Sequence, residues 1–239
     1  MSYSFSQRRV LIVGGSSGIG EAAAKAFAEA GAQVVIASRS QDRLDAASRR
    51  IGADVETAVL DTTDDAAVEA YFARSGSFDH VVVSAAKTPG GLVRSLPLPD
   101  AYSAMDSKFW GAYRVARAVS IRERGSLTFI SGFLSVRPGE WVLQGSINAA
   151  LEALARGLAL ELAPQKVRVN AVSPGMIATP LWGGLPDADR EAMYEHAAAT
   201  LPARTMGRPE DIANAILYLA STPYATGSTV LVDGGAAIA

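Results

Sequence analysis

The sequence contains no cysteine, which excludes disulfide bonds, thiolate nucleophiles and metal sites built on sulfur. Histidine is also scarce, because His80 and His196 are the only two in the chain. A histidine-built metal site needs more ligands than these two can supply. We therefore expect no bound metal.

The chain also lacks an excess of one charge and any long apolar run. Its formal net charge is −2, and acidic and basic residues are mixed in segments such as QDRLDAASRR. This pattern gives no basic footprint for nucleic acid or an anionic membrane. The apolar run after the paired arginines of MSYSFSQRRVLIVGG is too short for a signal sequence, and no later segment approaches a membrane span. We expect a cytoplasmic protein with a small-molecule partner, and neither a nucleic-acid nor a membrane partner.

Short apolar segments alternate along the chain with alanine-rich segments of helical period. The 239 residues, of which 49% are hydrophobic, are enough for one large domain. Near-continuous apolar strands separated by amphipathic helices indicate a parallel sheet that is covered on both faces. The expected strands are VLIVG, QVVIASR, VETAVLD, DHVVVSAA, SLTFIS, VRVNAVS and STVLVDGG. The sequence predicts a single-domain α/β protein over residues 1–239, with a Rossmann-type doubly wound fold and a seven-stranded parallel sheet.

Two segments are predicted as long helices, from about Asp100 to Arg124 and from about Ser146 to Ala163. A third segment, residues 179–208, falls outside the alternating pattern. It is rich in proline and glycine at its edges and amphipathic in its middle. A substrate flap has these features, and a plain surface excursion is the alternative.

The segment GGSSGIG follows the first predicted strand and leads into the first predicted helix. Glycine is needed where a backbone approaches a pyrophosphate closely, and the amide groups at a helix N-terminus bind anionic oxygens. This placement predicts a dinucleotide site. Its residues are Gly14, Ser16, Ser17, Gly18, Ile19 and Gly20.

The second predicted strand ends at Ser38 and Arg39. An NAD site usually places an acid here to bind the ribose hydroxyls, whereas a guanidinium can pair with a 2′-phosphate. We therefore expect NADP(H) to be preferred over NAD(H). The alternative is that Arg39 is a solvated surface arginine.

Over nearly its whole length the chain resembles the short-chain dehydrogenase/reductase family. The resemblance is carried by GxxxGIG, by Asp61 after the third strand, by NAVSPGMIATP, and by GRPEDIANAILYLAS with the terminal VDGG. It implies that Asp61 contacts the adenine. It further implies that Ser84, Ala85 and Ala86 line the adenosine side, and that Pro174, Gly175, Ile177 and Thr179 hold the nicotinamide.

The chain departs from the family at two places near the cofactor. Val13 replaces a threonine, and VSAA, residues 83–86, replaces NNAG. Both changes remove side-chain hydrogen bonds between the central strands. We expect binding to persist through backbone contacts, with some loss of local stability.

The family's catalytic residues are a serine, a tyrosine about thirteen positions later, a lysine four after that, and an asparagine on the preceding helix. In this chain the resemblance places Gln144 at the tyrosine, Asn148 at the lysine and Lys108 at the asparagine. Ser131 falls at the serine, although a shift of one residue places Gly132 there. Gln144 cannot exchange a proton near neutral pH, and loss of the general acid alone costs about 10²- to 10⁴-fold in rate.

Lys108 is the candidate replacement for the missing acid, because its ammonium could reach the region that a lysine at position 148 would occupy. A partly buried lysine with a lowered pKa can donate a proton or stabilise a developing alkoxide. The alternative is a structural lysine that caps its helix or bridges to a neighbour at a subunit contact.

Other side chains give weaker signals. Trp141, Trp182, Met193 and Tyr194 could form an apolar substrate wall or be plain packing. Tyr113 would need the other face of its helix to replace the missing hydroxyl. We expect His196 to be exposed and His80 to be structural.

Three functions remain open. The first is an NADP(H)-dependent oxidoreductase that acts on a carbonyl, an alcohol or a related small molecule with an altered tetrad. The second is a catalytically idle NADP(H)-binding sensor or partner subunit, and the third is a reductase of imines or activated double bonds. The resemblance also implies a homo-oligomer, a dimer or a tetramer, assembled through the two long helices.

Overall fold

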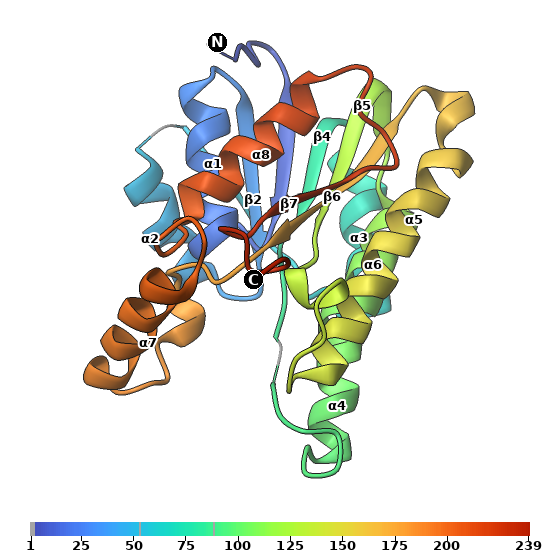
Figure 1. The fold of residues 1–239 in the computed structure, drawn as a ribbon. Coiled ribbons are helices and arrows are strands. Elements are labelled where there is room, and N and C mark those ends of the chain that lie inside the picture. Colours follow the sequence, from blue (N-terminus) through green and yellow to red (C-terminus); the bar gives the residue numbers. More distant parts are fainter. Residues whose placement is uncertain (1–2, 53, 88) are drawn as a thin grey trace.

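The computed structural model describes residues 3–52, 54–87 and 89–239, which form a layered α/β structure around one parallel sheet (Figure 1). All strand pairs are parallel, and the spatial order is β3-β2-β1-β4-β5-β6-β7. The strands are β1 (Arg9–Val13), β2 (Gln33–Ser38), β3 (Glu56–Val59), β4 (Phe78–Val83), β5 (Ile121–Ile130), β6 (Arg168–Pro174) and β7 (Thr229–Val232). The predicted single-domain Rossmann-type fold with seven parallel strands is confirmed.

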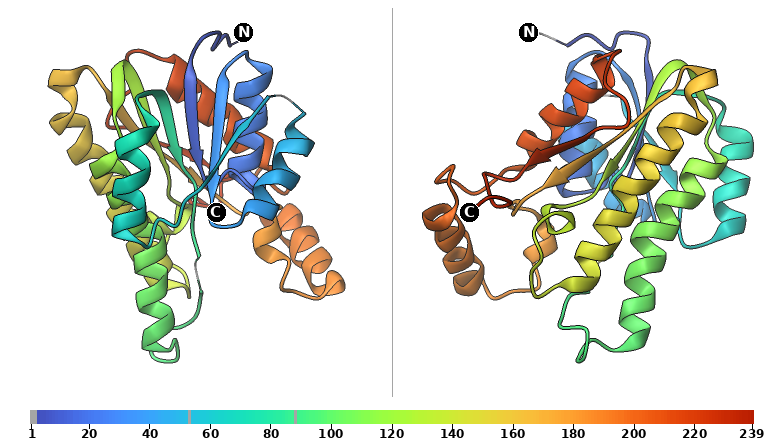
Figure 2. Two further views of the ribbon diagram at one scale, coloured as in Figure 1. Left: turned by 180° about the vertical axis from the view of Figure 1, so that it is seen from behind. Right: turned by 45° about the vertical axis from the view of Figure 1, so that its right-hand side comes forward.

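Helices cover both faces of the sheet, as Figure 2 shows from two sides. One face packs against α1 (Gly18–Glu29), α2 (Gln41–Ile51) and α8 (Pro209–Ser221), and the other against α3 (Asp65–Ser75), α5 (Gly111–Ala118) and α6 (Val142–Glu161). Successive residues of a strand therefore enter different cores: Val10 and Ile12 pack on the first side, Leu11 and Val13 on the second. Burial on both sides explains why the strands are continuously apolar.

The helix predicted from about Asp100 to Arg124 is present, but its predicted C-terminal end is wrong. The segment contains α4 (Leu98–Met105), a π-helical turn η1 (Asp106–Trp110) and α5, which ends at Ala118. The chain then turns into β5, where the Phe78 amide donates to the Ser120 carbonyl at 3.0 Å and Phe78 pairs with Ile121. Sheet pairing with β4 thus ends the helix earlier, and β5 starts before the predicted SLTFIS.

The other long helix also begins earlier than predicted. Its first intrahelical bond runs from the Gly145 amide to the Trp141 carbonyl, at 3.2 Å, so α6 starts at Val142 rather than Ser146. The helix ends at Glu161, and a short 3₁₀ turn, η3 (Ala163–Gln165), follows. As a result Gln144 and Asn148 lie in the first two turns of a regular helix.

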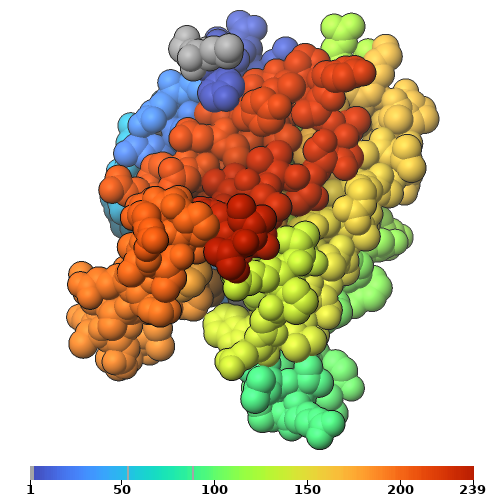
Figure 3. All heavy atoms as spheres, in the orientation of Figure 1, coloured from blue at the N-terminus to red at the C-terminus, as the bar shows by residue number. Residues whose placement is uncertain are grey.

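Residues 179–208 leave the sheet after β6 and contain η4 (Pro180–Trp182) and α7 (Asp187–Thr200). The base of this segment is fixed by a bridge between Ile177 and Gly207 and by the bond from the Ala178 amide to the Gly207 carbonyl, at 2.9 Å. In Figure 3 the α7 segment and the segment around α4 form two separate projections from the body. The action of residues 179–208 as a substrate flap stays a prediction.

Within residues 3–52, 54–87 and 89–239, no helix is both long enough and apolar enough to cross a bilayer.

His80 is a structural residue in the core, as predicted. Its Nδ1 lies 2.9 Å from the Ser126 hydroxyl, and its ring packs against Phe5 and Phe27. Burial, reinforced by the nearby Arg168 charge, lowers the pKa of His80 to about 4. The folded protein therefore holds this imidazole in its neutral form across the physiological range.

This burial predicts a specific dependence of stability on pH. The unfolded chain protonates His80 near pH 6.5 and the folded chain only near pH 4, so acidification through this window favours the unfolded state. The free energy of unfolding should fall by about 2–3 kcal/mol over the window, and His80→Gln should remove that part of the fall. Urea unfolding at a series of pH values measures this. His196→Gln, at an exposed position of α7, is the matched control, and equal pH slopes in wild type and His80→Gln would refute the assignment.

Candidate functional site

A cleft of about 1230 Å³ lies at the carboxyl ends of β1, β2, β4, β5 and β6. It extends from Arg39, just after β2, to Met193 on α7. The strand order reverses between β1 and β4, and such a switch point is where doubly wound sheets bind ligands. The cleft exceeds the usual volume of a small-ligand pocket, about 300–1000 Å³, and can hold a dinucleotide together with a substrate.

The glycine-rich turn forms the floor at the β1 end. Gly14 has a φ of +87°, and a Cβ there would lie 2.5 Å from the Ala85 amide nitrogen. A Cβ on Gly20 would lie 2.2 Å from the Gly14 carbonyl oxygen, so glycine is required for α1 to pack against the turn. Within the described residues, every predicted cofactor residue except Gly20 lines the cleft. Gly20 supports the turn from behind.

The departures near Val13 are compensated by the main chain. The Gly14 amide donates to the Ala37 carbonyl at 2.7 Å, and the Ser84 amide donates to the Val13 carbonyl at 2.8 Å. These bonds tie β1 to both of its neighbours at the edge of the cleft. The backbone thus holds this edge without the replaced side chains.

The adenosine end of the cleft is basic. Arg39, Arg43 and Arg50 line it, and the Arg50 guanidinium binds Glu21 with two contacts of 2.7 Å. Sequence reasoning had identified Arg39 alone, because Arg43 and Arg50 reach the site from the first and last turns of α2.

Asp61 also lines this end. Burial by itself would raise the pKa of its carboxyl, but hydrogen bonds from the Thr63 amide and hydroxyl, with the charges of Arg39 and Arg114, lower the pKa below its ordinary value. Asp61 is therefore ionised and fixed in orientation at neutral pH.

The opposite end of the cleft is built on one face of α6. Gln144, Asn148 and Glu152 are buried and follow each other at intervals of four residues. The π-helical turn η1 supplies Lys108, whose Nζ donates to the Asn148 Oδ1 at 2.6 Å and to the Ser131 carbonyl at 2.9 Å. The four residues predicted as catalytic therefore lie together in the cleft wall.

Glu152 is the residue at this end that sequence reasoning missed. Its Oε1 accepts hydrogen bonds from the Ser131 hydroxyl at 2.8 Å and from the Ser135 hydroxyl of η2 (Phe133–Ser135) at 2.7 Å. Burial lowers the pKa of Lys108 to about 8, and the charge of Glu152 opposes this shift. The helical spacing of Glu152 from Gln144 and Asn148 was the sequence signal that could have revealed Glu152.

Gln144 uses its amide nitrogen within the protein. Nε2 donates to the Pro89 carbonyl, and the orientation is fixed because that carbonyl can only accept. Oε1 is buried and has no hydrogen-bond partner among the described residues. An unmet buried acceptor costs about 1–3 kcal/mol, so this wall of the cleft is incomplete without a donor.

Ser131 and Gly132 have different surroundings. The Ser131 hydroxyl is directed to Glu152, whereas a Cβ at Gly132 would lie 2.6 Å from the Asn148 Nδ2. Asn148 therefore occupies the space that a side chain at residue 132 would need. Neither residue presents a free hydroxyl to the cleft.

Trp141 and Trp182 form an aromatic wall between the start of α6 and the η4 turn. Their ring centroids are 6.2 Å apart, Met193 lines the same cleft, and the Trp182 Nε1 donates to the Ile177 carbonyl at 2.9 Å. Gly90 packs directly against the Trp141 indole. Tyr194 is not among the residues that line the cleft, whereas the other three candidates are, and their contact with a substrate stays a prediction.

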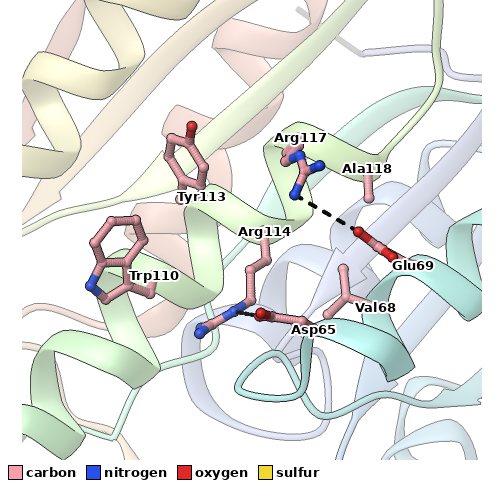
Figure 4. A pocket seen from close by; sticks show the side chains of 8 residues that line it. All are labelled: Asp65, Val68, Glu69, Trp110, Tyr113, Arg114, Arg117 and Ala118. Atoms are coloured by element: carbon pink, nitrogen blue, oxygen red, sulfur yellow. Dashed lines mark hydrogen bonds and ion pairs between the residues drawn. The ribbon is translucent and has the colours of Figure 1, made fainter.

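Tyr113 lies elsewhere. Figure 4 shows it on α5, beside Trp110 of η1 and next to the ion pairs of Arg114 with Asp65 and of Arg117 with Glu69. This shallow hollow between α3 and α5 is separate from the cleft. Tyr113 therefore does not supply the tyrosine hydroxyl of the family's catalytic residues, as expected because it lies on the other face of its helix.

Comparisons with known proteins agree with this geometry. A family described as "Enoyl-(Acyl carrier protein) reductase" matches residues 13–237. A short-chain dehydrogenase/reductase of Stachybotrys chlorohalonatus is 35% identical over 250 aligned residues, covering 95% of this chain and 96% of that protein. The chain belongs to the short-chain dehydrogenase/reductase family.

Other members of the short-chain dehydrogenase/reductase family extend the comparison. The 3-oxoacyl-[acyl-carrier-protein] reductase FabG of Thermotoga maritima is 32% identical, over 95% of this chain and 97% of that protein. The NADPH-bound structure of a short chain oxidoreductase from Pseudomonas aeruginosa, described as containing an atypical catalytic center, matches with a TM-score of 0.91 at 28% identity over 98% of each chain. The chain is thus an oxidoreductase of the short-chain type with NADPH-binding structural neighbours.

The Glu152 network predicts a measurable change at Lys108. Because the Glu152 charge raises the pKa of Lys108, Glu152→Gln should lower that pKa further below about 8. Side-chain nitrogen NMR of the lysines, Lys25, Lys87, Lys108 and Lys166, can follow this titration, with Lys108→Met assigning the resonance. Glu161→Gln, at the exposed end of the same helix, is the control. An unchanged or raised Lys108 pKa in Glu152→Gln would contradict the network.

Proposed function

We propose that this protein is an NADP(H)-dependent oxidoreductase that acts on a carbonyl, an alcohol or a related small molecule. The supporting observation is that one cleft joins the glycine-rich turn to the Lys108–Asn148 pair. The residues present fit the dinucleotide: Gly14 and Gly18 line the cleft with φ of +87° and +55°, which glycine adopts readily, and Pro174, Gly175, Ile177 and Thr179 line the region toward α7. When bound, the cofactor supplies or accepts the hydride.

The preference for NADP(H) over NAD(H) rests on charge. Ser38 provides no carboxylate to bind the ribose hydroxyls, and three arginines, Arg39, Arg43 and Arg50, line the neighbouring wall. Arg50 is already paired with Glu21, so Arg39 and Arg43 are the side chains assigned to a 2′-phosphate.

Replacing this charge pattern should reverse the cofactor preference. Ser38→Asp combined with Arg39→Gln removes a cation and adds an anion where the 2′-phosphate would lie. The affinity for NADPH should fall about 10- to 100-fold, with NADH affinity equal or higher. Fluorescence titration with both cofactors measures this, and Arg49→Gln, on the exposed side of α2, is the control. Parallel losses for NADPH and NADH would show that Arg39 does not read the phosphate.

We assign the altered tetrad as follows. Gln144 stands at the tyrosine position and transfers no proton, and Asn148 stands at the lysine position and is oriented by Lys108. Lys108 supplies the positive charge of this end of the site, from η1 rather than from α6. With its pKa lowered to about 8, it is also the group here that can donate a proton near neutral pH.

A specific observation favours a second candidate, the idle NADP(H)-binding sensor or partner subunit. The Ser131 hydroxyl donates to Glu152 and the Gln144 amide donates to Pro89, so neither is free to polarise a substrate carbonyl. An idle member would bind the cofactor in the same cleft without turnover.

Variants of Lys108 separate these candidates. Lys108→Met should keep NADPH binding and reduce turnover about 10²- to 10⁴-fold, because it removes the charge and proton source, and Lys108→Arg should retain part of the activity. Wild-type turnover should fall as the pH rises above about 8, where Lys108 loses its proton. Stopped-flow and steady-state NADPH oxidation across pH provide the measurement, with Lys25→Met on α1 as the control. Tight NADPH binding with no oxidation by any acceptor would favour the idle candidate.

Assembly and location stay predictions. A homo-oligomer is supported by the half-exposed Trp110 and Tyr113 beside α5 and by Gly157 of α6, which has open space around it. The cytoplasmic location rests on the sequence alone.

A further inference from the structure

Residue 132 is a glycine for a reason of space. The backbone of Gly132 is extended, with a φ of 164° and a ψ of 147°, so its conformation is open to any residue. A Cβ at this position would lie 2.6 Å from the Asn148 Nδ2 and 3.3 Å from the Asn148 Cγ. The amide group of Asn148 therefore fills the volume that a side chain at residue 132 would occupy.

The orientation of the Asn148 amide follows from its contact with Lys108. An ammonium group can only donate hydrogen bonds, so the amide atom that lies 2.6 Å from the Lys108 Nζ must be the oxygen, Oδ1. The nitrogen, Nδ2, is then the atom directed toward Gly132. Asn148 is only 4% exposed, so its packing also limits rotation of the amide. The site thus holds an NH₂ group, rather than a hydroxyl, beside residue 132.

This NH₂ group is open to the cleft. Within residues 3–52, 54–87 and 89–239 the Asn148 Nδ2 donates to no protein acceptor, and it is not one of the unpartnered polar atoms that are sealed from solvent. Asn148, Gly132 and Lys108 all line the cleft. Lys108 keeps one N–H bond after donating to Asn148 and to the Ser131 carbonyl. Because Oδ1 and Nδ2 belong to one amide, the two free donors are neighbours.

We propose that the Asn148 Nδ2 binds and polarises the carbonyl oxygen of the substrate, in the space that Gly132 leaves for it. The inference deepens the proposed NADP(H)-dependent reduction and rests on it. As a hydride adds to the carbonyl carbon, the π electron pair moves to oxygen, and Nδ2 and the remaining Lys108 N–H bond donate to the charged oxygen. Lys108 then transfers its proton to this oxygen, which gives an alcohol, NADP⁺ and a neutral lysine that water reprotonates.

The assignment links the altered residues to one another. The hydroxyl of Ser131 is not the donor, because it is bonded to Glu152 at 2.8 Å. A side chain at residue 132 would collide with Asn148, and without Lys108 the Asn148 amide would have no partner that fixes its orientation. The glycine, the amide and the cation are therefore one arrangement, in which an amide N–H takes the place of a serine hydroxyl.

A hydroxyl at residue 132 tests the proposal, because it can replace the amide in the same space. Asn148→Ala removes the donor, so kcat for carbonyl reduction should fall about 10²- to 10³-fold. Gly132→Ser alone should also lower kcat, because its Cβ displaces Nδ2. In the double variant Gly132→Ser/Asn148→Ala the hydroxyl enters the vacated space. Its kcat should recover at least about 10-fold over Asn148→Ala, with NADPH affinity unchanged.

The measurement is NADPH oxidation with three carbonyl acceptors, which are 1-tetralone, ethyl acetoacetate and phenanthrenequinone. Gly132→Ala/Asn148→Ala is the matched control, because it relieves the same crowding without supplying a hydroxyl and should show no recovery. Ser146→Ala, at an exposed position of α6, controls for changes in that helix. Fluorescence titration gives the affinity for NADPH, and circular dichroism confirms that each variant is folded.

The outcomes distinguish this inference from the proposed function. Recovery with serine and not with alanine at residue 132 supports the assigned donor. Equal recovery with both, no recovery with either, or full activity in Asn148→Ala overturns the inference and leaves NADP(H)-dependent reduction in place. Binding of NADPH without oxidation by any of the three acceptors overturns both the inference and the proposed turnover.

Discussion

The pairing of β1 with β4 is the constraint on which the rest of the molecule depends. Parallel hydrogen bonds from Val10 to Val13 fix the two strands in register, and both end at the same edge. The chain leaves β1 toward one face of the sheet and leaves β4 toward the other, because α1 and α5 lie on opposite faces. The space between these departures is the cleft. Gly14 and Ala85 approach so closely there that a single Cβ would separate the strands, so the same contact stabilises the sheet and shapes the site.

A partly buried cation dominates the other end. Lys108 is stabilised by two oxygen acceptors and by the neighbouring Glu152, which compensates for the cost of removing an ammonium from water. The π-helical turn matters here, because the extra residue in η1 changes the direction of side chains relative to a regular helix. The resemblance suggests that one lysine and one asparagine have exchanged elements. The cation and the amide are then both retained, but the cation comes from η1 rather than from α6.

The sequence predicted what depends on local periodicity and on glycine geometry. Seven apolar segments became seven strands, and the turn from Gly14 to Gly20 became a close backbone approach. Prediction from the sequence failed where contacts between distant residues determine the structure. Arg124 belongs to β5 because β4 pairs with that segment, and no local sequence signal indicates this pairing. The Gln144 amide orientation depends on the Pro89 carbonyl, 55 positions away in sequence, and the Ser131 hydroxyl depends on Glu152. Spacing identified these residues but could not show which of their atoms face the cleft.

The inventory of donors and acceptors then decides between reaction classes more directly than the identity of any one residue. A short-chain member that reduces ketones must place a donor against the developing oxyanion. Here the Ser131 hydroxyl and the Gln144 N–H are bonded to protein acceptors, whereas Lys108 keeps a third N–H bond for that role. An idle cofactor-binding protein has no need of Trp141, Trp182 and Glu140 at the same end of a cleft that continues past the cofactor region. Both observations are explained together if Lys108, whose pKa burial lowers to about 8, is the proton donor at this end of the cleft.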